Sequence, residues 1–264
     1  MPKPSTITAG IDIGSTASKA VILADGKIAA YFIGPSTVNP TKTAHEVFER
    51  ALAKAKIESH QVAYIVGTGY GRAKVEFAHE NVSEISCHAK GAHYLLPDVR
   101  TIIDIGGQDV KAISIDKSGN IREFAMNDKC AAGTGRFLDF MARSMGMQIK
   151  DMVELHFDEG PPALISSMCS VFAESEVINL VNEEVPLPSI VKGLHKSVAN
   201  RLHTLAPRVG VEKEIVVTGG VAKNRGVVQM LTEVLKEAFI HFPDHVDPQM
   251  IGALGAAVIA SKKT

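Results

Sequence analysis

An internal repeat constrains the fold of this chain more than any other feature. Residues 11–20 read IDIGSTASKA and residues 103–112 read IDIGGQDVKA, so the IDIG core and the lysine-alanine pair recur at identical offsets. Each copy continues into an apolar run, a turn and a third strand-like run. Because short apolar runs separated by turns are typical of hairpins, the repeat predicts two copies of a unit of three strands joined by tight turns.

The rest of the chain alternates between helical and strand patterns, which indicates an α/β fold. The expected strands cover residues 62–66, 214–218 and 239–242, and the expected helices cover residues 41–56, 136–145, 171–180, 189–207, 227–238 and a last one from about 248. We therefore expect two α/β halves, 1–100 and 101–247, with the C-terminal helix (248–264) packing on the first half. A helical segment that carries two cysteines, 130–181, is expected as an insertion in the second half.

Composition excludes several classes of function. The chain has 264 residues and a net charge of -1, which argues against a nucleic-acid surface or a polybasic membrane anchor. Its longest apolar stretch, 251–260, is too short to span a bilayer. Residues 1–6 lack the apolar segment of a signal peptide, and three cysteines without short spacing argue against a secreted disulfide framework. We expect a cytoplasmic protein that binds neither nucleic acid nor membrane.

The first copy of the repeat ends a strand with Asp12 and continues into a glycine turn rich in hydroxyl groups. Backbone N–H groups freed by such a turn can bind phosphate, and a nearby lysine adds positive charge. Asp12 is a candidate ligand of hydrated Mg²⁺, which takes few direct carboxylates. The candidate phosphate-binding residues are Gly14, Ser15, Thr16, Ala17, Ser18 and Lys19.

The second copy offers the same kinds of group. Asp104 is a second candidate Mg²⁺ ligand, and Gly106 and Gly107 are candidate contacts of the γ-phosphate. Gln108 is a candidate for holding the attacking water, since phosphoryl transfer depends mostly on placement and charge stabilisation. Asp12, Asp104 and Gln108 are thus the candidate catalytic residues.

A third glycine turn follows the expected strand 214–218 and precedes a helix, as a nucleoside-binding turn would. Its candidate residues are Thr218, Gly219, Gly220, Val221 and Asn224, to which the last part of the chain adds Gln249 and Gly252. Together the turns resemble the five-part signature of the superfamily of actin, heat-shock-70 chaperones and sugar kinases, which implies a duplicated actin-like ATPase fold. The sequence contains no Walker A motif, which disfavours a P-loop NTPase.

Two cysteines precede expected helices. Cys130 comes before the helix 136–145, and Cys169 comes before the helix 171–180. Thiolates at helix N-termini are stabilised by the helix dipole, which suits metal ligation, whereas free cysteines are commonly buried as small apolar side chains. Spacing alone leaves both alternatives open, and two cysteines cannot complete an ordinary four-ligand iron–sulfur site. The third cysteine, Cys87, is expected not to be a ligand.

With these cysteines, the chain resembles the activator ATPases of 2-hydroxyacyl-CoA dehydratases, a family that includes the ATPase subunits of benzoyl-CoA reductases. The segments that show the resemblance are 10–19, 104–109, 127–138, 169–177, 218–222 and 252–257. The resemblance implies a homodimer that shares a [4Fe-4S] cluster, ligated by Cys130 and Cys169 of both subunits. It also implies ATP-driven transfer of one electron from ferredoxin or flavodoxin to an iron–sulfur dehydratase or related CoA-ester or double-cubane reductase, with ATP/ADP and Mg²⁺ as the other cofactors.

Two other functions stay open on the residues alone. A small-molecule kinase of the same superfamily, for example one acting on an amino sugar, would need an acceptor pocket and a base such as Asp104 or Asp109. A chaperone-like or filament-forming ATPase would need further subdomains, for which 264 residues leave little room. The loop TGYGR at 68–72 is expected to be either a plain turn or a segment that lines the cleft.

Overall fold

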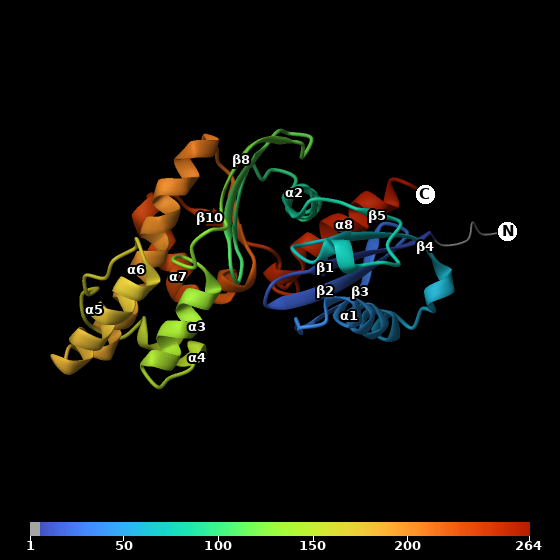
Figure 1. Cartoon of the computed structure of the whole chain (residues 1–264). Helices are drawn as coiled ribbons and strands as arrows, with labels where there is room; N and C mark the ends of the chain where they lie inside the picture. Colours follow the sequence, from blue (N-terminus) through green and yellow to red (C-terminus); the bar gives the residue numbers. More distant parts are fainter. Residues whose placement is uncertain (1–5) are drawn as a thin grey trace. The chain divides into compact units, whose positions relative to one another are not determined.

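The structure is a computed structural model that describes residues 6–264, and the chain divides into two compact units (Figure 1). Unit 1 contains the described residues up to Ile102 together with Ile115–Arg122 and Phe242–Thr264. Unit 2 contains Ile103–Ser114 and Glu123–His241. Residues 1–5 lie outside the described residues. They make up most of the segment, residues 1–6, whose composition argues against a signal peptide.

Unit 1 is built on the first copy of the repeat. Its sheet has the order β3-β2-β1-β4-β5, in which β1, β2 and β3 form an antiparallel meander and β4 and β5 are added in parallel. The strands are β1 (Ile7–Ile13), β2 (Ala17–Ala24), β3 (Lys27–Pro35), β4 (Val62–Thr68) and β5 (Glu80–Asn81). β1 lies at the centre of this sheet, and all of its residues are buried.

Alternate residues of β1 pack against different helices. Ile11 belongs to an apolar cluster with α1 (Pro40–Ala55), whereas the Thr8 hydroxyl donates at 3.3 Å to the carbonyl oxygen of Ala257 in α8 (Ile251–Ser261). Successive side chains of a strand point to opposite faces of the sheet. The sheet of unit 1 is therefore covered by α1 on one face and by α8 on the other (Figure 1).

α2 (Glu84–Leu95) crosses α8 so closely that the two backbones touch. A Cβ at Gly255 would collide with the carbonyl oxygen of Cys87 in α2, and a Cβ at Gly91 would collide with the carbonyl oxygen of Ile251 in α8. Glycine is needed at both positions, because any side chain would push the helices apart. The buried side of α2 consists mostly of small residues, so the apolar spacing that predicts a helix is weak and the sequence pattern missed it.

The second sheet contains the second copy of the repeat and has the order β10-β9-β6-β7-β8. Its strands are β6 (Thr101–Ile105), β7 (Val110–Ile115), β8 (Ile121–Asn127), β9 (Ile215–Thr218) and β10 (Phe239–Ile240). The helices of unit 2 are α3 (Gly135–Ser144), α4 (Ile149–Leu155), α5 (Ser170–Asn182), α6 (Leu187–Leu205) and α7 (Arg225–Leu235). One apolar cluster joins β6, β7 and β9 to all five helices, with Phe137, Met141 and Leu194 buried at its centre.

The two predicted three-strand units are confirmed as β1–β3 and β6–β8, and the other predicted elements occur with small shifts at their ends. Proline explains the early end of α6, because it cannot continue a helix. α6 gives way to a 3₁₀ turn that contains Pro207, and α8 starts only after a 3₁₀ turn that begins at Pro248. The 3₁₀ turns are Ser59–Gln61, Arg72–Lys74, Ala206–Val209, Gly220–Lys223 and Pro248–Met250. Besides α2, the sequence pattern missed β5 and the short α4.

Between residues 6 and 264, every helix is too short or too polar to cross a membrane. The three cysteines are all free thiols.

The crossing of α2 and α8 predicts that Gly255→Ala destabilises the protein, although alanine is the better helix former. The gain in helix propensity is worth about 1 kcal/mol, whereas a methyl group forced into a packed contact costs about 1–3 kcal/mol and more where it meets backbone. Urea unfolding should therefore give a lower free energy of unfolding than for wild type. Lys262→Ala, at the exposed end of α8, is the control and should stay within about 0.5 kcal/mol of wild type. A more stable Gly255→Ala variant would contradict the crossing.

Candidate functional site

The register of a hairpin forms the carboxylate–lysine pair of unit 1. Asp12 in β1 lies opposite Lys19 in β2, and Lys19 Nζ donates to Asp12 Oδ2 at 2.8 Å. Gly14–Thr16 close the hairpin between the two strands. Asp12 is only 4% exposed, so its negative charge is removed from water and depends on the lysine for compensation.

The hydroxyl groups around this turn differ in their access to a ligand. Ser18 is fully buried, and its Oγ lies 2.8 Å from Ser36 Oγ, which in turn donates to the carbonyl oxygen of Gly14 at 2.6 Å. Ser15 is half-buried and Thr16 is exposed. Ser18 therefore holds the shape of the turn, while Ser15 and Thr16 are the hydroxyls that a phosphate could reach.

Two glycines leave space for the Asp12 carboxylate. A Cβ at Gly252, in the first turn of α8, would lie 2.7 Å from Asp12 Oδ2 and 3.0 Å from His88 Nε2. A Cβ at Gly69, just after β4, would collide with Asp12 Oδ1. Gln249 lies in the turn before α8. Among the residues selected from the sequence, the structure thus brings Asp12, Lys19 and Gly252 together in unit 1.

In unit 2, Asp104 is paired with a lysine that is almost completely buried. Lys111 is 1% exposed, and its Nζ lies 3.2 Å from Asp104 Oδ2 and 2.8 Å from Asp109 Oδ2. Thr218 Oγ1 donates to Asp104 Oδ1 at 3.0 Å. Two carboxylates share this ammonium group, which leaves negative charge that a divalent cation could balance. Lys111 is not among the residues predicted from the sequence, although the repeat aligns it with Lys19.

The second glycine turn is joined to the N-terminus of α3. The N–H of Gly135 donates to the carbonyl oxygen of Gly106 at 2.9 Å, and the N–H of Arg136 donates to that of Gly107 at 3.0 Å. The Gln108 side chain meets the Arg136 guanidinium, which donates to the amide oxygen when the amide is turned toward it. The turn and the first residues of α3 therefore move together.

The third glycine turn packs against β6. Gly219 has φ +88°, and a Cβ there would lie 2.8 Å from Asp104 Oδ1. Asn224 caps α7, since its Oδ1 accepts from the N–H of Val227 at 3.1 Å, while its Nδ2 lies 3.2 Å from His195 Nε2. Gly220 and Val221 begin the 3₁₀ turn between them. Because both ends of the Asn224 amide are engaged within unit 2, its role as a nucleoside contact stays a prediction.

The repeat extends to a turn that the sequence pattern left undecided. Thr68 and Gly69 follow β4 as Thr218 and Gly219 follow β9, and both glycines have φ +88° and lie against the aspartate of their own unit. Thr68 is the β-ladder partner of Asp12, and its buried hydroxyl pairs with no oxygen or nitrogen atom among residues 6–264. Thr68 and Gly69 therefore belong to the site of unit 1. A threonine–glycine pair at the end of the fourth strand of each sheet, counted along the chain, was the signal that could have found them.

The two candidate cluster cysteines come from segments that meet in unit 2. Cys169 is the N-cap of α5, and Cys130 Sγ lies 3.9 Å from the carbonyl oxygen of Met168. Both thiols are half-buried. Three large apolar side chains next to Cys169 are mostly exposed: Met168 at 78%, Val171 at 63% and Phe172 at 65%. Such clustered apolar exposure marks a contact surface.

Cys130 lies in the turn before α3, as the sequence predicts, but it is not at the helix N-terminus, where the helix dipole was expected to stabilise its thiolate. α3 starts at Gly135, and the intervening turn is held by a bond from Thr134 Oγ1 to the carbonyl oxygen of Ala131 at 2.6 Å. Asn127 Nδ2 donates to the carbonyl oxygen of Cys130 at 3.2 Å. Because the effect of a helix dipole fades beyond the first turn, it acts on Cys169 and not on Cys130.

Cys87 differs from both. It is fully buried in α2, and burial raises the pKa of its thiol to about 12. A thiol that stays protonated at neutral pH is a poor metal ligand. Within the part of the chain that the structure describes, no three side chains of the types His, Cys, Asp or Glu are grouped so that they could hold a metal ion.

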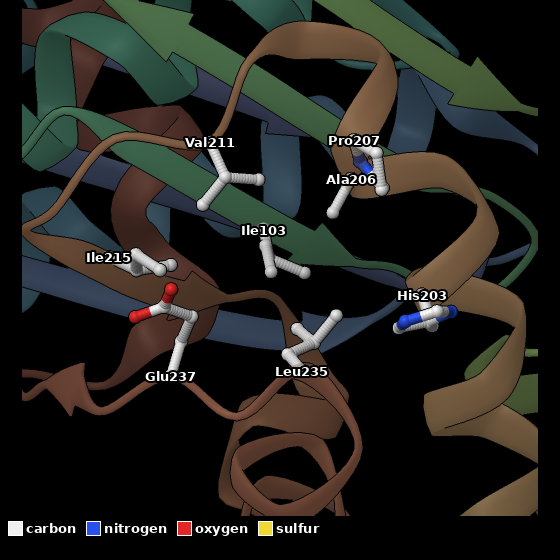
Figure 2. Close-up of a pocket in the computed structure, with 8 residues that line it drawn as sticks. All are labelled: Ile103, His203, Ala206, Pro207, Val211, Ile215, Leu235 and Glu237. Atoms are coloured by element: carbon white, nitrogen blue, oxygen red, sulfur yellow. The ribbon is translucent and has the colours of Figure 1, made fainter.

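Figure 2 shows a cavity of about 350 Å³ in unit 2. Ile103, Ile215 and Leu235 give it apolar walls, while His203 and Glu237 supply polar groups. None of the residues selected from the sequence lines this cavity, so it is a feature separate from the glycine turns.

Known proteins resemble the chain over nearly its whole length. Residues 9–260 match the BadF/BadG/BcrA/BcrD ATPase family. The activator of lactoyl-CoA dehydratase from Anaerotignum propionicum is 50% identical over 257 residues, which cover 96% of each chain.

Solved structures agree with this match. The activator of the 2-hydroxyisocaproyl-CoA dehydratase from Clostridium difficile with bound ADPNP is 43% identical, with a TM-score of 0.91 over 98% of this chain and 95% of that one. Component A of the (R)-2-hydroxyglutaryl-CoA dehydratase from Acidaminococcus fermentans is 45% identical, with a TM-score of 0.93 over 98% and 99%. The ethanolamine utilization protein EutJ from Carboxydothermus hydrogenoformans and a ROK family glucokinase from Streptomyces griseus share only the fold, with TM-scores of 0.61 and 0.54 at 16% and 14% identity. These likenesses confirm a duplicated α/β fold of the actin-like ATPase type, and the match of sequence and structure from end to end shows that the chain belongs to the BadF/BadG/BcrA/BcrD ATPase family.

Proposed function

We propose that this protein is an ATP-driven electron donor that activates an iron–sulfur 2-hydroxyacyl-CoA dehydratase or a related CoA-ester or double-cubane reductase. Close relatives named as dehydratase activators support the proposal. The observation that carries it is the pair of hydrogen bonds from the first amides of α3 to the carbonyl oxygens of Gly106 and Gly107. A turn of the phosphate-binding type thus directly holds the helix that follows Cys130.

The nucleotide part of the proposal rests on the two aspartate–lysine pairs. Asp12 and Asp104 are the proposed Mg²⁺ ligands, acting through bound water, and each stands beside a glycine turn whose amides suit phosphate. Lys19 compensates the charge of Asp12, and Lys111 that of Asp104. Gln108, next to the Arg136 guanidinium, is proposed to hold the attacking water while the arginine favours negative charge nearby.

The cysteine pair fits a [4Fe-4S] cluster shared by two chains. Cys130 and Cys169 are free and partly exposed, and the Cys130 thiol already reaches the residue before Cys169. Two thiolates make half of the usual set of four, so a second copy of this chain would supply the rest. The exposed side chains of Met168, Val171 and Phe172 offer apolar area for such a dimer to bury. A cluster held there would store and release one electron.

The connection between nucleotide and cysteines follows from unit 2 itself. The N–H of Gly106 already donates to the carbonyl oxygen of Asp109 at 2.9 Å, which leaves the N–H of Gly107 for the nucleotide. A γ-phosphate that draws this N–H toward it moves the carbonyl groups that hold α3, and with them the turn around Cys130. If the nucleotide favours one arrangement of this segment and the partner enzyme favours the same one, each ligand strengthens the binding of the other by the same factor. Ferredoxin or flavodoxin as electron source, and the cytoplasm as location, are proposed from the family resemblance.

The ligand assignment predicts the iron content of the protein. After anaerobic purification, wild type should contain about two irons and two sulfides per chain and run as a dimer, as one shared four-iron cluster requires. Cys130→Ser and Cys169→Ser should each lose the iron while ADPNP still binds. Cys87→Ala should keep the iron, because this thiol is buried and protonated. Full iron content in either serine variant would refute the assignment.

A second prediction separates hydrolysis from the cluster. Asp104→Asn should keep its iron but lose ATP hydrolysis by about a hundredfold or more, because a neutral amide binds Mg²⁺ less well than a carboxylate, while Asp109 still balances Lys111. Asp116→Asn makes the same change at an exposed turn and is the matched control. The readouts are phosphate release and iron per chain. Hydrolysis by Asp104→Asn at the rate of the control would exclude Asp104 from the catalytic site.

A further inference from the structure

A chain of buried hydrogen bonds links three helices of unit 2. His156 Nδ1 lies 2.9 Å from His195 Nδ1, and His195 Nε2 lies 3.2 Å from Asn224 Nδ2. His156 ends α4, His195 lies within α6 and Asn224 caps α7. The three residues are 2%, 0% and 5% exposed. Buried polar groups are retained at a cost, and the proposed chemistry makes no use of the two histidines.

The hydrogen-bond partners fix where the protons lie. Asn224 Oδ1 accepts from the N–H of Val227, so the amide nitrogen faces His195 and donates to its Nε2. His195 therefore carries its own proton on Nδ1 and donates it to Nδ1 of His156. The direction of donation runs from the cap of α7, through α6, to the end of α4.

Both imidazole rings are neutral in this arrangement, and their surroundings also favour the neutral form because they lower the pKa of each ring. Burial lowers the pKa of His195 to about 3, with His156 acting in the same direction. The pKa of His156 is lowered by burial and by Lys192 of α6, against the opposing effect of Glu233 of α7. Protonation of either ring would place two donors face to face, so the link requires both imidazoles to be uncharged.

The sequence keeps space for the two rings. A Cβ at Gly226, the second residue of α7, would lie 2.6 Å from Cγ of His156 and 2.7 Å from Nδ1 of His195. Glycine inside a helix is about 1 kcal/mol less favourable than alanine. The imidazole pair explains why this position nevertheless holds glycine.

The helix that carries His195 also holds the loop leading to Cys169. Residues 157–169, here called the cysteine loop, run from the end of α4 to the N-cap of α5. Hydrogen bonds in both directions join α6 to this loop. Lys192 Nζ donates to the carbonyl oxygen of Gly160 at 2.8 Å, and Ser197 Oγ donates to that of Ser166 at 2.9 Å. In the other direction, the N–H of Ala163 donates to the carbonyl oxygen of Ser189 at 2.9 Å. α6 is thus bonded to the third glycine turn through Asn224 and to the cysteine loop along its length.

We propose that His195 is a positioning residue that couples the third glycine turn to the cysteine loop, so that a nucleotide at the turn alters the segment leading to Cys169. This inference rests on the proposed function, and it adds to it the route by which the nucleotide acts on the second cysteine. A shift of Asn224 is transmitted to His195, and α6 then carries it to the cysteine loop.

Two isosteric substitutions divide the link at its middle. In His195→Asn, the amide nitrogen takes the place of Nδ1 and keeps the bond to His156 but loses the one to Asn224. In His195→Gln, the amide oxygen takes the place of Nε2 and keeps the bond to Asn224 but loses the one to His156. If His195 only supported the fold, both variants would lose the response of the cysteine loop to a similar extent. Coupling through Asn224 predicts instead that the two variants differ in this response.

The test measures ADPNP affinity and hydrogen exchange of the cysteine loop in the anaerobically purified full-length protein. In wild type, ADPNP should change exchange in residues 157–169. His195→Asn, which cuts the bond to Asn224, should lose this change and raise the dissociation constant about fivefold, whereas His195→Gln should keep the change and stay within about twofold of the wild-type dissociation constant. His203→Asn makes the same change at an exposed position of α6 and should behave as wild type.

The outcomes separate the inference from the proposed function. A loop response in His195→Asn equal to that of wild type, a response lost equally in His195→Gln, or none in wild type with ADPNP bound, would overturn the coupling. Failure of wild type to bind ADPNP would overturn the proposed function instead. If both variants fail to fold, Ser197→Ala replaces them, because it cuts α6 from Ser166 without touching the turn. It should reduce the loop response at unchanged ADPNP affinity, and an undiminished response would equally overturn the proposal.

Discussion

A lysine opposite an aspartate across a hairpin is the interaction on which the rest of the structure depends. Asp12 and Lys19 form it in unit 1, and Asp104 and Lys111 form it in unit 2. Removing one partner of a buried ion pair typically costs about 3–5 kcal/mol, because the other charge is left uncompensated. The space for each carboxylate is kept by a glycine that follows a neighbouring strand, Gly69 or Gly219. In each unit, the ion pair therefore requires both the aspartate–lysine spacing in the sequence and a glycine backbone beside the carboxylate.

Much of the fold and of the candidate site could be predicted from the sequence, because the repeat and the glycine turns are visible as local patterns. The strands of both repeats and most helices follow from apolar spacing between turns. The position of α2 could not be predicted in this way, since it depends on a contact of backbone with backbone at Gly91 and Gly255. The sequence predicts Cys130 in a segment that leads into α3, but only the structure shows that the intervening turn keeps it away from the helix N-terminus, whose first amides bond to the second glycine turn.

Two features of unit 2, the burial of Lys111 and the contact of His156 with His195, could not be predicted from local sequence patterns. Lys111 reads as an ordinary strand residue until the repeat is aligned, and only the fold shows that it is buried between two carboxylates. The contact of His156 with His195 joins residues 39 positions apart on different helices, so no spacing rule could reveal it. In unit 2 the second glycine turn meets α3, and the third meets α6 through Asn224. The second turn is thus bonded directly to the helix that follows Cys130, and the third turn is bonded to α6, which holds the loop leading to Cys169.

The burial of Cys87 has a practical consequence for the chemistry of the folded chain. Alkylating reagents attack the thiolate, and a thiol with a pKa of about 12 contains on the order of one thiolate in 100,000 at pH 7. Cys130 and Cys169 are instead half-buried at the surface of unit 2. We therefore expect iodoacetamide to label Cys130 and Cys169 in the folded protein and to spare Cys87. The natural sequence already contains a two-site chemical reporter on the segments where electrons are proposed to pass, and no residue has to be changed to use it.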